Sequence, residues 1–162
     1  MEFAEFAARA ADIEDESADL ETIGLVAELF DDAEEDLDIV ARFVQGRVFP
    51  APDGTKLDIG PSLCRAALAK AAGPNVTADD IEARLAAVGE IGAVAEELDL
   101  GGQRGLSAFG DEQRDALTVA AVDSELRTLA ATSGDGSTDT KLDTLFGLFN
   151  RASPAESTVL AR

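Results

Sequence analysis

The sequence contains two helix starts in the segment SGDGSTDTKLDTLFGLFNRASPAESTVLAR, residues 133–162. A loop of Gly, Ser and Thr leads into a helix that we expect to begin at about Ser137. A second helix is predicted from Ser153, because Ser153 and Glu156 have capping-box spacing and Pro154 suits the first helical turn. The first turn of a helix presents unpaired N–H groups and the positive end of the dipole. A helix N-terminus can therefore bind phosphate even where few lysines are present.

Helical periodicity also predicts helices over most of the remaining chain. Apolar residues recur at this spacing in the ranges 2–12, 17–30, 37–46, 61–72, 77–88, 93–98 and 115–131. No segment shows the alternation of a strand bounded by turn residues. We expect one all-α domain over residues 1–162, a compact bundle of about eight or nine short helices.

The helix predicted from Pro154 to Arg162 stops without a Gly, Asn or Pro cap. We therefore expect a truncated last helix and a domain that is incomplete at its C-terminus, as the front part of a longer protein.

The composition excludes several kinds of chemistry. The chain lacks His, the commonest general base and a common metal ligand, and its one cysteine, Cys64, excludes an internal disulfide. No catalytic cluster, metal cluster or phosphate-binding Walker lysine can be assembled. We predict no catalytic residue, no metal and no cofactor for this chain. With no apolar run of roughly 20 residues, we expect a cytoplasmic protein without membrane contact.

The net charge of −20 has two possible explanations. An acidic surface either serves a specialised acidic function or keeps a protein soluble in a high-salt cytoplasm. The basic residues are ten Arg and only three Lys, with Asp and Glu at surface positions where Lys is usual. This bias favours a halophilic, archaeal origin.

The acidic residues are unevenly distributed. Residues 1–38 hold fifteen acids and one base, and residues 79–133 hold twelve acids and four bases. By contrast, residues 39–78 hold two acids and five bases, and residues 134–162 hold four acids and three bases. Either residues 39–78 are more buried than the rest, or these two segments form a surface that meets an anion.

The order of several motifs resembles one known family, the N-terminal helical domain of archaeal and eukaryotic-type ATP-dependent DNA ligases. The resemblance begins in four segments, FAEFA (3–7), RFVQGRVFP (42–50), LDIGPSL (57–63) and GEIGAVAE (89–96). It continues in KLD (141–143), LFGLF (145–149), ASPAE (152–156) and LAR (160–162).

The resemblance implies a domain that grips nicked duplex DNA through its minor-groove phosphates, for nick sealing in replication, repair and recombination. It places the K-x-D-G lysine, ATP and Mg²⁺ in a following domain, so the adenylation and OB domains are absent from this chain. The run KLDIG at 56–60 departs from K-x-D-G by one residue. ATP and Mg²⁺ are thus implied for the parent enzyme, and we expect this fragment alone to be inactive.

The two segments with few acids contain our candidates for DNA contact. They are Arg47, Lys56, Gly60, Ser62 and Lys70 in the first segment, and Gly134, Gly136, Ser137, Thr138, Lys141 and Arg151 in the second. Ordinary alternatives stay open for some of them, with Ser137 and Thr138 as helix caps alone and Lys70 on a solvated helix face. In molar salt the Debye length falls to about 3 Å, which favours short backbone and hydroxyl contacts with phosphate.

The Gly-rich loop at 99–112 holds one further motif. Gln103, Leu106 and Phe109 have the Q-x-x-L-x-x-F spacing that resembles the peptide docking on sliding clamps, although Gly110 stands where a second aromatic is usual. The alternative is an ordinary loop whose Leu106 and Phe109 fold back on the core.

We therefore expect a monomer that binds nicked double-stranded DNA, is nucleoid-associated when bound, and has a sliding clamp as a second candidate partner. The rival hypothesis is an acidic helical protein–protein adaptor without DNA affinity.

Overall fold

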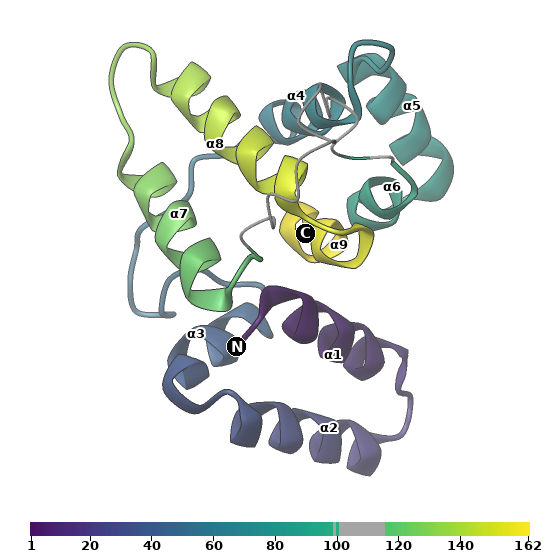
Figure 1. Ribbon diagram of the computed structural model, residues 1–162, viewed down its shortest axis with the longest axis vertical. Helices are drawn as coiled ribbons and strands as arrows, with labels where there is room; N and C mark the ends of the chain where they lie inside the picture. The colour runs from purple at the N-terminus through teal and green to yellow at the C-terminus, as the bar shows by residue number, and fades with distance from the viewer. Residues whose placement is uncertain (99, 101–115) are drawn as a thin grey trace.

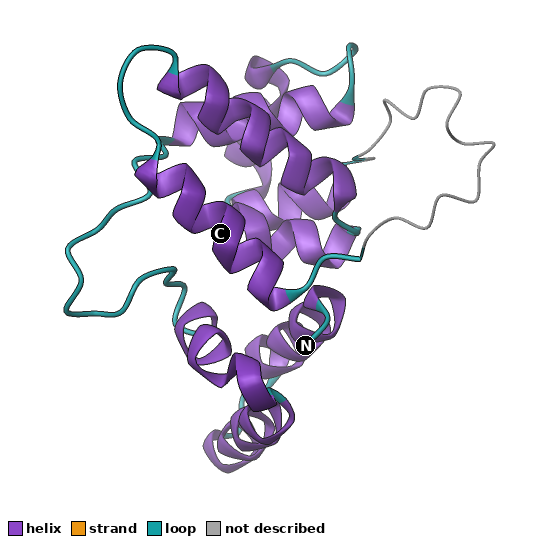
Figure 2. Cartoon of the chain, turned by 60° about the vertical axis from the view of Figure 1, so that its left-hand side comes forward, coloured by secondary structure: helices purple, strands orange, loops and turns teal. Residues whose placement is uncertain are grey.

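The computed structural model describes residues 1–98, 100 and 116–162 of the chain (Figure 1). In these ranges the protein is built from helices without a strand, which confirms the predicted all-α bundle (Figure 2). The elements are α1 (Phe3–Asp15), α2 (Asp19–Asp32), a short 3-10 helix η1 (Glu34–Asp36), α3 (Leu37–Phe43), α4 (Pro61–Ala72), α5 (Ala78–Val88), α6 (Ile91–Glu97), α7 (Val119–Ala131), α8 (Ser137–Arg151) and α9 (Pro154–Ala161). None of the described helices has both the length and the apolar character that crossing a bilayer requires.

The capping box predicted at the start of α9 is present, and the structure has another at the start of α5. The Thr77 hydroxyl accepts from the Asp80 amide at the start of α5, and Ser153 does the same for Glu156 at the start of α9. The range 2–12 predicted for the first helix ends too early, because α1 continues to Asp15. Ile13, which packs against the hydrophobic core, lies in the additional residues.

Two hydrophobic clusters form the core, and α8 contributes to both. The first cluster includes Leu68 and Ile81 together with Leu145 and Phe149 of α8. The second gathers residues of α1, α2, α3 and α7 around Leu148 of the same helix. Because successive residues of α8 face different clusters, this helix joins the two halves of the molecule (Figure 1).

The N-terminus is fastened to the start of α7 by backbone hydrogen bonds. The Phe3 amide donates to the Leu117 carbonyl at 2.7 Å, and the Val119 amide donates to the Met1 carbonyl at 3.1 Å. The terminal ammonium group lies 2.5 Å from an Asp36 carboxylate oxygen. These contacts hold the acidic N-terminal segment, residues 1–38, against the start of α7.

Helices α6 and α9 approach each other closely at Gly92. The Thr158 hydroxyl donates to the Gly92 carbonyl at 3.3 Å, and a Cβ added at Gly92 would lie 2.9 Å from the Thr158 carbonyl oxygen. Glu90 caps α6 by accepting from the Gly92 and Ala93 amides, both at 2.7 Å. Burial by itself raises the pKa of the Glu90 carboxyl, but Arg162 and the two amides outweigh it and hold that pKa below its ordinary value.

We expect Gly92→Ala to lower the free energy of unfolding by about 1–3 kcal/mol, because the added methyl group meets backbone that cannot turn aside. Gly24→Ala on α2 is the matched control, since its added Cβ would have no neighbour within 4 Å. That substitution should raise stability by up to ~1 kcal/mol through helix propensity. Urea unfolding measures both, and equal effects from the two glycines would contradict the close approach.

Candidate nucleic-acid interface

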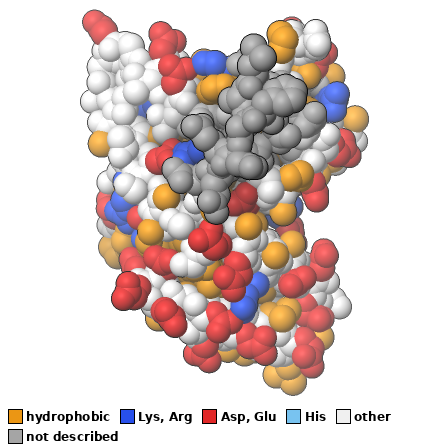
Figure 3. Space-filling model, viewed as in Figure 1, with side chains coloured by type: hydrophobic (Ala, Val, Ile, Leu, Met, Phe, Trp, Pro, Cys, Tyr) orange, Lys and Arg blue, Asp and Glu red, His pale blue; other side chains and the backbone are white. Residues whose placement is uncertain are grey.

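Helix α4 packs along α8, which places the two segments with few acids side by side (Figure 1). Lys70 of α4 bridges to α8, with its ammonium nitrogen 2.6 Å from Asp143 and 4.8 Å from the centre of the Phe146 ring. Figure 3 shows carboxylates gathered over α1 and α2, in the lower part of the view. The uneven charge of the sequence is thus an uneven charge of the surface.

Most cations in the described ranges are neutralised by neighbouring carboxylates, and three exposed ones are not. Arg47, Lys56 and Arg84 are exposed and have no acidic partner within 4.0 Å in the part of the chain that the structure describes. Arg47 and Lys56 line the same groove of about 1180 Å³ between the two core clusters, whereas Arg84 lies outside it on α5. The structure therefore brings together two of the predicted DNA contacts.

A buried ion-pair network holds the loop that carries Arg47. The Arg42 guanidinium donates to Asp123 at 2.9 Å, and Arg127 donates to the other oxygen of that carboxylate at 2.7 Å. Arg42 also donates to the Val48 carbonyl, and the Arg47 amide returns to the Arg42 carbonyl at 3.0 Å. The loop is thus tied down on both sides of Arg47. The sequence alone does not indicate this network, because Arg42 and Asp123 are 81 residues apart.

The start of α4 is an open helix N-terminus. Gly60 is its N-cap and Pro61 its first residue, with no side-chain cap and no acid in the first turn. Gly60, Pro61 and Ser62 are exposed. The Leu63 and Cys64 amides turn back to the Gly60 carbonyl, at 3.0 and 3.2 Å. Ser62 thus lies exposed in an uncapped first turn, where an anion is favoured by the helix dipole.

The start of α8 is likewise uncapped by side chains. Gly136 is its N-cap in the left-handed conformation at φ 79°, and Gly134 has φ 95°. Ser137 begins the helix as predicted, but neither Ser137 nor Thr138 makes a capping hydrogen bond, so the alternative that they serve only as caps finds no support here. Asp139 lies in the same first turn, which makes this start less favourable to an anion than that of α4.

Three predicted contacts have other partners in the structure. Lys141 is only 7% exposed, and its ammonium group donates to backbone carbonyls. Arg151 lies 2.5 Å from Glu125 and donates to the Gly147 carbonyl at 3.1 Å. Lys70, as described above, pairs with Asp143 at the surface. None of these three therefore offers a free charge.

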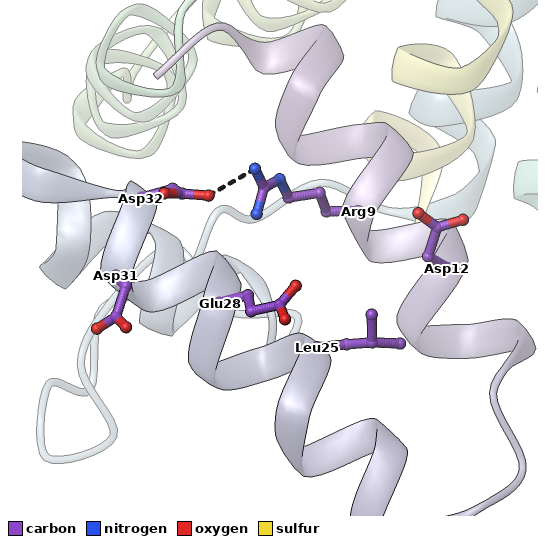
Figure 4. Close-up of a pocket in the computed structure, with 6 residues that line it drawn as sticks. All are labelled: Arg9, Asp12, Leu25, Glu28, Asp31 and Asp32. Atoms are coloured by element: carbon purple, nitrogen blue, oxygen red, sulfur yellow. Dashed lines mark ion pairs between the residues drawn. The ribbon is translucent and has the colours of Figure 1, made fainter.

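A second hollow, of about 370 Å³, lies between α1 and α2 and is acidic (Figure 4). Arg9 reaches across it from α1 to Asp32 at 2.6 Å, and Asp12, Glu28 and Asp31 complete its polar lining. Its negative charge disfavours phosphate, so this end of the molecule opposes the candidate interface in charge.

The remaining predicted chemistry is limited. Across the described residues, no group of three or more acidic or Cys side chains is arranged to hold a metal ion. Cys64 is partly buried, and burial raises the pKa of its thiol. The clamp-docking motif of Gln103, Leu106 and Phe109 lies outside the residues that the structure describes.

Comparison with known proteins finds a matching family and several similar sequences. A profile of the family described as "DNA ligase N terminus" matches residues 2–162. A DNA ligase from Natronomonas pharaonis is 72% identical over 163 residues, which cover 100% of this chain and 30% of that protein. The DNA ligase of Haloferax volcanii is 67% identical, covering 100% and 28%, and that of Pyrobaculum islandicum is 34% identical, covering 100% and 27%. The chain spans less than a third of the length of these relatives.

We expect Asp123→Ala to lower the free energy of unfolding by about 3–5 kcal/mol, because it removes the buried carboxylate that Arg42 shares with Arg127 and leaves the buried Arg42 guanidinium only the exposed Asp38 as a counter-charge. Glu125→Ala is the control on the same helix. Its pair with Arg151 is about one-third exposed and should contribute only about 0–1 kcal/mol. Urea unfolding of the two variants decides the point, and a loss at Asp123 no larger than at Glu125 would show that the network does not hold the loop.

Proposed function

The chain belongs to the DNA ligase N-terminal family, and from this premise we propose that it grips duplex DNA around a nick so that the full ligase can seal it. The sealing activity is a property we propose for the whole protein. The nicked duplex is the substrate that we infer for it, and the part played by this chain is to hold the DNA.

One observation carries the proposal. In a protein of net charge −20, two exposed cations, Arg47 and Lys56, line one groove and have no acidic partner within 4.0 Å among the residues that the structure describes. The open start of α4 follows Lys56 after only four residues. An acidic protein that leaves cations and helix N-termini free in one region has a surface suited to an anion.

The contacts that we propose are with phosphate. Arg47 and Lys56 supply charge, whereas Gly60, Ser62 and the 134–138 loop supply backbone N–H groups and hydroxyls. Phosphate contacts fix the position of a protein on DNA without reading its sequence. Such a grip suits an enzyme that must act at any nick.

The acidic helices α1 and α2 restrict where DNA can bind on the protein. Their carboxylates repel phosphate, so the duplex is favoured along Arg47 and the start of α4 and disfavoured over the acidic hollow between α1 and α2. We also propose that this acid load is an adaptation to high salt, where screening shortens the repulsion to about 3 Å and leaves the close contacts intact.

ATP and Mg²⁺ belong, in this proposal, to the parent ligase. No acidic cluster in the described part of this chain fits a metal ion, and KLDIG lacks the K-x-D-G spacing. We therefore derive no chemical step from these residues.

We expect the wild-type chain to bind a fluorescent nicked duplex at micromolar protein in KCl, measured by anisotropy over a series of KCl concentrations. Arg47→Met and Lys56→Met should each weaken binding and reduce the slope of log affinity against log salt by about one, because each removes one phosphate contact. Arg84→Met is the control, since Arg84 is an exposed cation outside the groove.

Absence of binding by the wild-type chain would instead support the acidic adaptor without DNA affinity. An equal loss in Arg84→Met would reject the assigned surface.

The start of α4 is tested by Gly60→Glu, which places a carboxylate where we propose a phosphate. The position has φ −84° and room for a side chain, so folding should be unaffected. Gly60→Gln controls for size without charge. We expect Glu to weaken DNA binding about tenfold more than Gln, in line with the repulsion of two like charges in contact. Equal affinities would remove α4 from the interface.

A further inference from the structure

Lys141 is a buried lysine whose hydrogen bonds go to the backbone of a distant loop. It lies in the second turn of α8 and is 7% exposed. Its ammonium nitrogen donates to the Leu57 carbonyl at 3.0 Å and lies 3.5 Å from the Asp58 carbonyl. No carboxylate in the described ranges lies within ion-pair distance of it.

Burying an ammonium group is costly unless its hydrogen bonds are satisfied, so these carbonyls are specific partners. The segment that they belong to has no regular structure between residues 55 and 60. Asp58 has φ 50°, a left-handed conformation that is uncommon for residues other than glycine. The loop thus adopts a backbone shape that it would not favour by itself, and Lys141 contacts it at that point.

The same segment carries the proposed DNA contacts on both sides of the Lys141 hydrogen bonds. Leu57 and Ile59 pack against the first core cluster, while Lys56 and Gly60 are exposed. Lys56 directly precedes the first held carbonyl, and Gly60 follows the second by two residues. Fixing Leu57 and Asp58 therefore fixes the direction of Lys56 and the start of α4 together.

We propose that Lys141 is a positioning residue. Its ammonium group holds the Leu57 and Asp58 carbonyls and so presents Lys56 and the start of α4 to DNA, without touching DNA itself. The proposal rests on the proposed function for the identity of the ligand, whereas the loop-holding role is independent of any ligand. It replaces the sequence prediction that Lys141 contacts phosphate.

The chain has only three lysines, so all three can be followed by acetylation with acetic anhydride and peptide mass mapping of the wild-type protein. Without DNA, Lys56 and Lys70 should react quickly. Lys141 should react at least about tenfold more slowly than these two lysines, because acetic anhydride reaches its amine only after local opening. With nicked duplex, Lys56 should become protected and the rate at Lys141 should not change.

The outcomes separate the two proposals. Rapid acetylation of Lys141 without DNA, followed by protection with DNA, would overturn the positioning role and restore direct contact. Slow acetylation of Lys141 with no effect of DNA on Lys56 would sustain the loop-holding role and count against Lys56 as a DNA contact.

A second test compares the variant Lys141→Met with the control Lys70→Met. The control removes a different contact between α4 and α8, the pair of Lys70 with Asp143. A lysine-specific protease should cleave after Lys56 at least tenfold faster in Lys141→Met, because the released loop enters the protease more readily. Lys70→Met should leave that rate unchanged. Equal cleavage rates in wild type and Lys141→Met would contradict the proposal.

A double-mutant cycle on DNA affinity adds a third test. It distinguishes a lysine that positions Lys56 from one that only stabilises the fold. In the Lys141→Met background, Lys56→Met should change DNA affinity less than about twofold, because Lys56 is no longer presented. Arg47→Met, whose loop is held by Arg42, should keep its full effect in that background. Additive losses for Lys56 and Lys141 would show that they act independently and would reject the positioning role.

Discussion

The packing of α8 against α4 is the contact on which the rest of the structure depends. Leu145 and Phe149 of α8 enter one core cluster and Leu148 enters the other, so α8 joins the two halves, as Leu160 of α9 also does. The same helix holds the loop before α4 through Lys141. Loss of this contact would open the first core cluster and release the loop before α4, which belongs to the surface that we assign to DNA.

The distribution of charge follows from a scarcity of cations. With 13 basic residues against 33 acidic ones, the chain uses several of its cations inside or between helices. Arg42 is buried with Asp123, and Lys141 is buried with two carbonyls. Because few cations remain exposed, binding of phosphate also needs backbone N–H groups. These groups carry no net charge and are not neutralised by neighbouring carboxylates. An acidic protein can in this way bind an anion with few exposed cations.

Local sequence signals predicted the local structure well. The capping spacing at Ser153 and Glu156 and the start of α8 at Ser137 depend on neighbouring residues, so one sequence reveals them. The roles of Lys141 and Arg42 depend on partners 84 and 81 residues away, which only the fold brings near. A buried lysine in a polar helical turn is indistinguishable in sequence from an exposed one, so the sequence does not indicate the burial of Lys141.

The central claim is that DNA binds the face formed by the Arg47 loop, the start of α4 and the start of α8, and avoids the acidic α1–α2 pair. The most direct measurement is an NMR titration of backbone amides in the ¹⁵N-labelled chain with nicked duplex in high KCl. The account predicts the largest shift changes in residues 47–62 and 134–138, with the α2 amides unmoved. Changes concentrated in α2, or no changes at saturating DNA, would contradict it.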